Sequence, residues 1–411
     1  ACKCQSHTSY GLTVLRRAII MVPKDFSGEE KGFMNVAMDQ FAQVARSPGD
    51  WLKAWKAGSG KKVIGCFPLY IPEELIHAAG MLPVVLQGSD KPVTRAGEYL
   101  HSNVCHPVQG NFDQALRGEM DYVDGVAFAD ICEQAKRASS LWRLYHTFPY
   151  RFNFLFPHVL NSPAASPYMI KELGRFKRSL EEFSGRKIAS GALAQSIALY
   201  NRTRELLAEL YRRRQQSPGS FTVAEVARIM AAAQTMPKED FNPLLKTYLA
   251  GKDATAGAGD RVPLLLACNQ CEDLEPGMAE TVDGVGALVV NDDLYPGYRY
   301  FATPVPPVQQ NGDPLKVLSQ AHFSLPACPT RHNPVNNWGQ HLIDRARQSG
   351  AKGVVLLMQQ FCEIHYFEYP LVKDRFAQEG MPLLMLETDH GGAAGRVKTR
   401  LEAFLEMVKE A

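Results

Sequence analysis

Residues 62–86, with the sequence KVIGCFPLYIPEELIHAAGMLPVVL, decide the fold class of this protein. The apolar run Lys62–Phe67 has strand length, and Pro72 followed by two carboxylates is the expected start of a helix. Gly80 ends that helix, and Pro83–Leu86 is a second apolar run of strand length. Strands that alternate with helices in this way predict a parallel sheet.

The same alternation extends over much of the chain. Two more strands are expected at Val123–Phe128 and Tyr150–Leu155. Helical periodicity then dominates from Ser166 to about Ala250, and a Gly/Ala-rich stretch at 250–259 marks a boundary. Beyond this boundary, four apolar runs have strand length, and helical stretches separate them. The four runs are Val262–Ala267, Gly286–Asn291, Gly353–Met358 and Pro382–Leu386. The helical stretches include Trp338–Ser349 and Glu368–Glu379.

We therefore predict an α/β protein with two doubly wound, flavodoxin-like parallel-sheet domains. The predicted division is a helical N-terminal extension (1–60), a first α/β domain (61–165), a helical insert (166–255) and a second α/β domain (256–411). Ligands of such folds bind beyond the carboxyl ends of the strands.

Composition excludes several classes of protein. The 411 residues are 45% apolar and 21% charged, which is ordinary for a globular protein, and the net charge of +2 gives no electrostatic basis for nucleic-acid binding. The apolar stretch Leu12–Val22 is interrupted by two arginines and is far below the roughly 20 residues that span a bilayer. It also lacks a cleavage pattern, so we expect a cytoplasmic protein without a membrane span.

Two candidate nucleotide motifs do not match their patterns. Gly58–Lys62 (GSGKK) lacks the first glycine and the final Ser/Thr of a phosphate loop, and it precedes a strand instead of following one. Asp283–Gly286 has no third glycine at dinucleotide-binding spacing. The pair Cys268 and Cys271 is a lone Cys-x-x-Cys, which is a weak signal for zinc or redox chemistry.

Three of the nine cysteines have a more informative position. Cys132 and Cys362 each follow a predicted strand, in different α/β domains, and Cys105 lies in a Pro-containing loop before a helix predicted at Asn111–Arg117. Three thiolates around an interdomain cleft can hold three irons of a [4Fe–4S] cube and leave the fourth iron open for substrate. The alternative is that each cysteine is a small buried apolar residue.

Several motifs resemble the benzoyl-CoA reductase / 2-hydroxyacyl-CoA dehydratase family, over roughly residues 60–411. They are Gly65–Pro83, Asp121–Gly125, Ile131-Cys132, Ser184–Ile188, Gln360–Cys362, Glu387–Asp389 and Thr399–Phe404. The resemblance implies one [4Fe–4S] cluster held by Cys105, Cys132 and Cys362, and the short interval between the first two looks most like the smaller cluster subunit of ATP-dependent aromatic-ring reductases. Related double-cubane proteins use additional cysteines, for which Cys66, Cys271 and Cys328 are candidates, although Cys66 lies two residues earlier than that pattern expects.

The resemblance also implies a function and partners. The first expectation is an iron–sulfur subunit that reduces an aromatic acyl-CoA ring, and the alternative is dehydration of a 2-hydroxyacyl-CoA through a ketyl radical. A homologous cluster subunit, separate ATP-hydrolysing activator subunits and ferredoxin as the electron source are implied as partners. The hypothesis from a different class is a non-catalytic scaffold with structural zinc or no metal.

Other candidate residues are polar. Glu74, in the first turn of the helix after the first strand, is the candidate for handling protons or orienting substrate in the cleft, and its alternative role is to stabilise the helix start. His106 and His365 lie near candidate ligands, but we expect them to be solvated surface histidines. A solvated basic helix face is expected at Arg202, Arg204, Arg212, Arg213 and Arg214.

Overall fold

The computed structural model describes residues 30–88, 91–252, 257, 259–269, 271, 274, 277–333, 337–389 and 394–410. Cys2, Cys4, the stretch Leu12–Val22 and part of the Gly/Ala-rich boundary lie outside these residues. Within the described part of the chain, no helix is long and apolar enough to cross a membrane.

The first sheet is four-stranded and entirely parallel. Its strands are β1 (Val63–Phe67), β2 (Leu82–Val85), β3 (Gly125–Asp130) and β4 (Tyr150–Leu155), in the order β2-β1-β3-β4. Alternate residues of β1 face opposite cores: Val63 and Phe67 pack with α5 (His106–Leu116) and α6 (Glu133–Tyr145), and Ile64 and Cys66 pack with α4 (Glu73–Ala78) and α7 (Ala165–Ser184). Helices therefore cover both faces of this sheet. The short helix η1 (Ala96–Glu98) precedes α5.

The second sheet repeats this topology. It contains β5 (Val262–Cys268), β6 (Ala287–Asp293), β7 (Gly353–Gln359) and β8 (Leu383–Thr388) in the parallel order β6-β5-β7-β8. Leu264 and Leu266 pack with α11 (Met278–Gly284) and α16 (Ala394–Glu410), and Leu265 and Ala267 pack with α14 (Trp338–Ser349) and α15 (Glu363–Gln378). The predicted pair of doubly wound, flavodoxin-like domains is confirmed.

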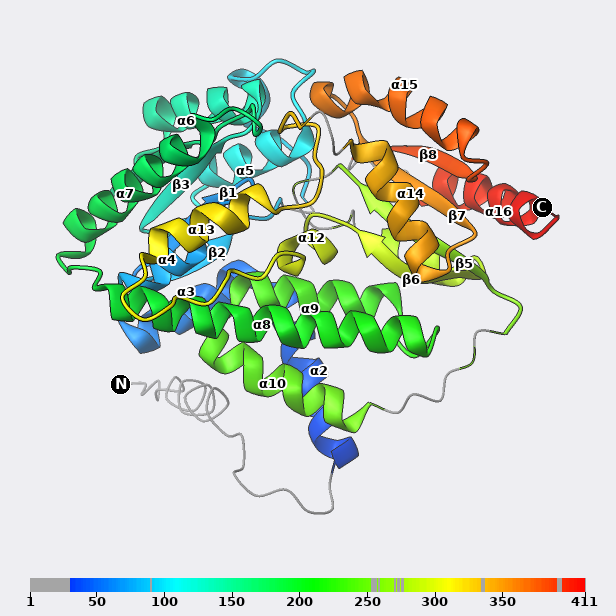
Figure 1. The fold of residues 1–411 in the computed structure, drawn as a ribbon, viewed down its shortest axis with the longest axis horizontal. Helices are drawn as coiled ribbons and strands as arrows, with labels where there is room; N and C mark the ends of the chain where they lie inside the picture. The colour runs from blue at the N-terminus through cyan, green and yellow to red at the C-terminus, as the bar shows by residue number, and fades with distance from the viewer. Residues whose placement is uncertain are drawn as a thin grey trace, which may run out of the picture.

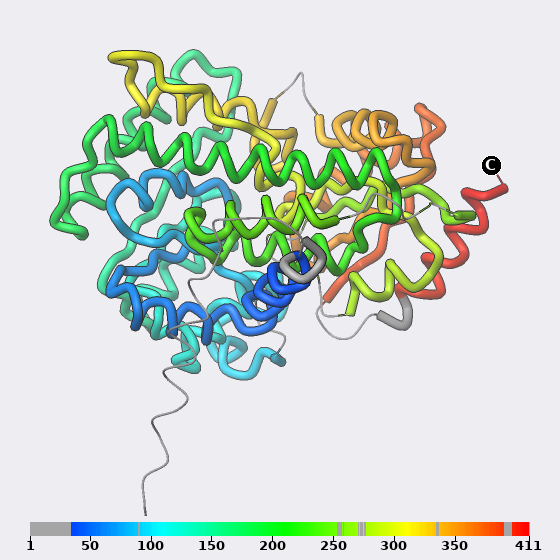
Figure 2. The backbone as a smooth tube through the Cα atoms, turned by 90° about the horizontal axis from the view of Figure 1, so that it is seen from below, coloured from blue at the N-terminus to red at the C-terminus, as the bar shows by residue number. Residues whose placement is uncertain are grey.

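A helical layer joins the two sheets. It consists of α2 (Glu30–Arg46), α3 (Pro48–Ser59), α8 (Ser190–Gln216), α9 (Val223–Thr235) and α10 (Lys238–Gly251). The long helix α8 runs beneath both sheets, as Figure 1 shows. Its Ile197 packs in the core of the first sheet, and its carboxyl-terminal half contacts β6 of the second. Figure 2 shows these helices from below, where α2 packs on α9 and α10. The division of the chain at residues 60, 165 and 255 stays a prediction.

All eight strands lie where apolar runs predicted them, but two helices begin earlier than expected. Helix α5 begins at His106 and not at Asn111, because a proline such as Pro107 is favoured in the first turn of a helix and does not interrupt it there. Helix α15 begins at Glu363 and continues through Pro370. Both shifts place a cysteine directly at a helix start. Of two short helices that follow β6, α12 (Tyr298–Phe301) lies between the two sheets and contacts α8 and β6, whereas α13 (Pro314–Phe323) packs on α7 over the first sheet (Figure 1).

Candidate functional site

The three candidate cluster ligands share one local geometry. Cys105, Cys132 and Cys362 are the N-cap residues of α5, α6 and α15. Cys132 follows β3 and Cys362 follows β7, so both lie at the carboxyl edges of their sheets. The partial positive charge of a helix N-terminus stabilises a thiolate or another anion there. Three helix starts thus present their cysteines in a setting suited to an anionic group.

Gln134, which no sequence pattern indicated, ties the three cysteine loops together. Its Oε1 accepts a hydrogen bond from the Cys105 backbone N–H at 2.8 Å, and its amide donates to the Phe361 carbonyl at 2.9 Å. The amide also lies 3.5 Å from the Asn103 carbonyl. Because Gln134 is two residues beyond Cys132, one side chain links the loops of all three cysteines across the two domains. Its partner Phe361 is 227 residues away, so no local pattern could have identified it.

The thiols at this site lie close enough to affect one another. Burial, and then the neighbouring Cys362, raise the pKa of the Cys132 thiol to about 11. Burial raises the pKa of the Cys271 thiol well above its ordinary value, and the thiols that add to this shift are those of Cys362, Cys132, Cys105 and Cys328. Burial thus disfavours the thiolate forms of Cys132 and Cys271, and a bound metal ion would deprotonate a coordinating thiol outright.

The three N-cap cysteines form a donor set of the kind that an iron–sulfur cluster uses. In the described residues, no group of three or more His, Cys, Asp or Glu side chains is placed to hold one metal ion. In a [4Fe–4S] cube each thiolate binds a different iron, so the sulfur atoms surround a volume and do not converge on a point. Cys105, Cys132 and Cys362 would hold such a group, with Cys271 beside them.

Cys362 has a chain of polar partners that Cys132 lacks. Its Sγ lies 3.1 Å from His365 Nδ1, and His365 Nε2 lies 3.2 Å from the Tyr295 hydroxyl. That hydroxyl is 2.9 Å from Cys328 Sγ. Burial alone would lower the pKa of His365, but Cys362 and Cys328 outweigh it and raise the value to about 9. His365 is only 1% exposed, so the expectation of a surface histidine was wrong, because α15 turns its first face into the core. His106 is half-buried.

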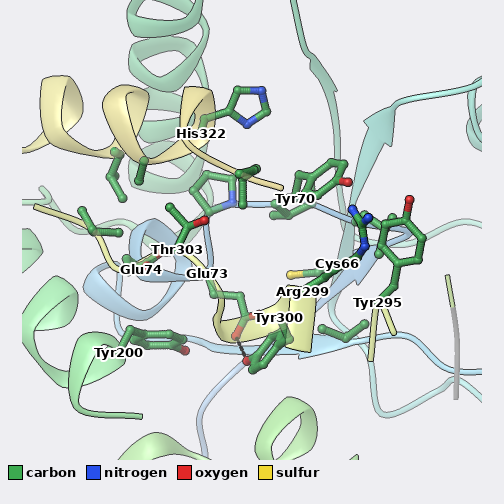
Figure 3. A pocket seen from close by; sticks show the side chains of 18 of the residues that line it. Cys66, Tyr70, Glu73, Glu74, Tyr200, Tyr295, Arg299, Tyr300, Thr303 and His322 are labelled. Atoms are coloured by element: carbon green, nitrogen blue, oxygen red, sulfur yellow. Dashed lines mark hydrogen bonds between the residues drawn. The ribbon is translucent and has the colours of Figure 1, made fainter. Parts of the chain in front are cut away.

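A cavity of about 150 Å³ lies between the two sheets and adjoins the cysteines through Cys271. Its walls come from the carboxyl end of β1, from α7 and α8, and from the segment that follows β6 (Figure 3). Most of the lining is apolar or aromatic, as with Leu69, Tyr70, Val305 and Leu318. Cys66 of β1 also lines it and is buried, and burial raises the pKa of its thiol.

Two adjacent carboxyl groups enter this cavity from the start of α4, each with its own cation. The Glu74 carboxylate accepts a hydrogen bond from Arg204 of α8, and both side chains are largely buried. Burial alone would lower the pKa of Arg204, and Glu74 more than reverses that. Glu73 lies 3.6 Å from Lys238 Nζ and accepts a hydrogen bond of 3.0 Å from the Tyr300 hydroxyl. Glu74 therefore does more than stabilise a helix start.

The same pairings correct the expected basic face of α8. Arg204 pairs with Glu74, and Arg214 is 1% exposed and pairs with Asp292 at 3.1 Å. Arg202 and Arg212 pair with glutamates on their own helix and lie in solvent. The arginines point to different sides of the helix because 3.6-residue periodicity separates positions two apart.

The chain is similar to subunits of known acyl-CoA enzymes. The chain is 29% identical over 364 residues, or 87% of its length and 94% of the relative's, to a benzoyl-CoA reductase subunit of Thauera aromatica. It is 29% identical to lactoyl-CoA dehydratase subunit beta of Anaerotignum propionicum, over 90% of this chain and 98% of that one. It is 28% identical to (R)-2-hydroxyglutaryl-CoA dehydratase subunit beta of Acidaminococcus fermentans, over 91% and 99%. The model of the 2-hydroxyglutaryl-CoA dehydratase D-component family matches residues 68–408, and the chain belongs to that family.

Proposed function

We propose that this chain is the iron–sulfur subunit of an ATP-dependent, low-potential acyl-CoA reductase that reduces the ring of an aromatic acyl-CoA. The observation that carries the proposal is the joining of the Cys105, Cys132 and Cys362 loops by Gln134, beside an apolar cavity. These three cysteines would hold one [4Fe–4S] cluster, which supplies electrons one at a time at low potential.

The cavity supports an aromatic acyl group as the substrate. An apolar cavity of about 150 Å³ holds a benzene ring, and this cavity has that volume. The lining cations Arg204 and Arg299 already pair with Glu74 and Asp293, and Lys238, which does not line the cavity, pairs with Glu73. An acyl group with a second carboxylate would therefore meet no uncommitted positive charge among these residues. We propose that the acyl group enters this interdomain cleft, with its thioester near the cluster and away from water.

Dehydration of a 2-hydroxyacyl-CoA through a ketyl radical is the second candidate. It is favoured by the two relatives named as dehydratase beta subunits, which match this chain as well as the reductase relative does. A double-cubane reductase is a variant of the same proposal, because Cys271 lies among the three candidate ligands. A non-catalytic scaffold is the weakest candidate.

The proposed partners follow from the reaction. The chain would work in the cytoplasm with a homologous cluster subunit, and separate activator subunits would hydrolyse ATP and pass on electrons from ferredoxin.

Gly60 ends α3 as a left-handed C-cap at φ 67°, so Gly58–Lys62 is a helix end. We therefore expect the purified chain alone not to hydrolyse ATP, and ATPase activity in partner-free protein would contradict this assignment.

The test is anaerobic purification followed by iron and sulfide analysis and an absorption spectrum. We expect a brown protein with about four irons per chain. Cys105→Ser, Cys132→Ser and Cys362→Ser should each remove most of the iron, whereas Cys4→Ser should not. Full iron retention in the triple variant would exclude these ligands. The complex assembled with its partner and activator is then supplied with benzoyl-CoA or lactoyl-CoA, and turnover of one but not the other decides between reduction and dehydration.

Glu74 is proposed to orient substrate or handle protons in the cavity. Glu74→Gln should leave the iron content unchanged and lower acyl-CoA turnover at least about tenfold, because a positioned acid or base typically contributes more than that. Normal turnover of this variant in the assembled complex would reduce Glu74 to a structural partner of Arg204.

A further inference from the structure

We infer that Glu73 donates one of the two protons that ring reduction consumes, while Lys238 and Tyr300 hold its carboxyl group in the cavity. This inference rests on the proposed function and assigns the proton chemistry of the same cavity to a residue that no sequence pattern singled out.

The position of Glu73 is unusual for a carboxyl group. It is the first residue of α4, it lines the cavity, and its side chain is 10% exposed. The Tyr300 hydroxyl donates to its Oε2, as the dashed line in Figure 3 marks. Lys238 Nζ lies 3.6 Å from the same oxygen, and the lysine side chain is 1% exposed. The enclosed Lys238 side chain thus lies beside a carboxyl group that lines an apolar cavity.

The neighbouring Glu74 makes a useful contrast. Its carboxylate is bound directly by the Arg204 guanidinium, which stays protonated under all ordinary conditions. Glu73 faces a lysine, which loses its proton much more readily when it is buried. Of the two carboxyl groups that line the cavity, Glu73 is therefore the one whose partner permits a change of protonation.

Burial favours the uncharged forms of both Glu73 and Lys238. It raises the pKa of Glu73 and lowers the pKa of Lys238. The titratable and charged groups that face Glu73 come from four other elements and from its own helix: they are Cys66, Tyr200, Arg204, Lys238, Tyr300 and Glu74. Burial and the neighbouring Glu74 raise the pKa of Glu73, whereas Lys238, Tyr300 and Arg204 lower it without cancelling the rise. The net rise favours one proton held between Glu73 and Lys238 over two separate buried charges.

Reduction of one ring double bond takes two electrons and two protons. The electrons arrive singly from a reduced low-potential iron–sulfur donor. For one proton, the O–H bond of Glu73 breaks and a ring C–H bond forms, which leaves the Glu73 carboxylate beside the neutral Lys238 amine. The second proton comes from water, and water also reprotonates Glu73 after the product leaves.

The experiment uses the assembled holo complex with Glu73→Gln and the control Glu181→Gln. Glu181 is equally buried but pairs with Lys177 on α7 and does not line the cavity. We expect Glu73→Gln to keep its iron and its Kd for benzoyl-CoA while kcat falls by roughly a hundredfold or more. Glu181→Gln should keep kcat within about threefold, since it removes no group from the cavity.

A pH profile separates proton donation from a structural role. A donor must be protonated, so wild-type kcat should fall as pH rises through the pKa of Glu73. Glu73→Asp should keep that fall and part of the rate, and Glu73→Gln should lose it. A Glu73→Gln complex with near-normal kcat would overturn the inference, and so would an unchanged pH profile.

Two further outcomes remain decisive. If Glu73→Gln loses its iron, Tyr300→Phe tests the same point, because it removes the 3.0 Å hydrogen bond to Glu73 and, besides that, only a 3.4 Å hydrogen bond to the Ala233 carbonyl. A lowered kcat with an altered pH profile then supports the inference, and unchanged values overturn it. If the wild-type complex does not reduce benzoyl-CoA, the proposed function itself fails, which is distinct from a failure of Glu73 in an active complex.

Discussion

Strands β3 and β7 occupy equivalent positions in two sheets of the same topology, yet the side chains around their carboxyl ends differ. Each strand is third in its sheet, and each is followed by a cysteine at the N-cap of the next helix. Cys132 Sγ accepts a 3.4 Å hydrogen bond from Ala135 N–H of its own helix. Cys362 Sγ instead contacts His365, which continues to Tyr295 and Cys328.

The difference shows that topology places a cysteine at the end of a strand but does not set the environment of that cysteine. The β3 end supplies Gln134, which reaches out to the other two loops. The β7 end supplies the buried series of hydrogen-bonding side chains that begins at His365. It also holds the backbone of Phe361 in the left-handed region, with φ of 66°. The β3 end therefore links the three cysteine loops, and the β7 end surrounds its cysteine with polar side chains. Three variants test this division of labour.

The largest effect is expected from Gln134→Leu, which removes the link between the two ends. Loss of two or three hydrogen bonds, at about 0.5–1.5 kcal/mol each, should speed cluster loss at least about tenfold. The measurement is the rate of bleaching under a chelator in anaerobic buffer. Glu133→Gln is the matched control, because that exposed neighbour pairs only with Arg137 along its own helix. Equal bleaching of the two variants would show that Gln134 does not hold the loops.

A smaller effect is expected from His365→Leu, which makes the β7 end resemble the β3 end. The cluster should remain, but its reduction potential should become more negative, because hydrogen bonds to ligand sulfurs favour the reduced state. A redox titration followed by electron paramagnetic resonance measures this. His146→Leu, at the far end of α6, should leave the potential unchanged. Identical potentials in both variants would mean that the two ends are electrostatically alike.

The smallest effect is expected from Phe361→Gly. A non-glycine residue in the left-handed region costs about 1–2 kcal/mol, and glycine loses about 0.5–1 kcal/mol of that gain through chain entropy. The free energy of unfolding in urea should therefore rise by no more than about 1 kcal/mol. Phe367→Gly, at an 83% exposed position inside α15, should lower it by about 1 kcal/mol instead. A loss of stability in Phe361→Gly would indicate that the partly exposed ring packs usefully.

The strands were predictable because each is a short apolar run that parallel sheets require. The helix starts at Cys105 and Cys362 were less predictable, since Pro107 and Pro370 look like breakers in sequence and are accommodated in the structure. His365 was misjudged for a related reason. A histidine three residues after Cys362 carries no burial signal until α15 is packed against α14.

The sequence by itself determined the two parallel sheets and the positions of Cys132 and Cys362 just after two of their strands, because local apolar runs specify both. The tertiary structure decided which side chains meet between the sheets. Gln134 and Phe361 are 227 residues apart, and Glu73 and Lys238 come from α4 and α10. Such pairs arise only when the helical layer brings the two domains together, and contacts between distant segments leave no periodic trace in a single sequence.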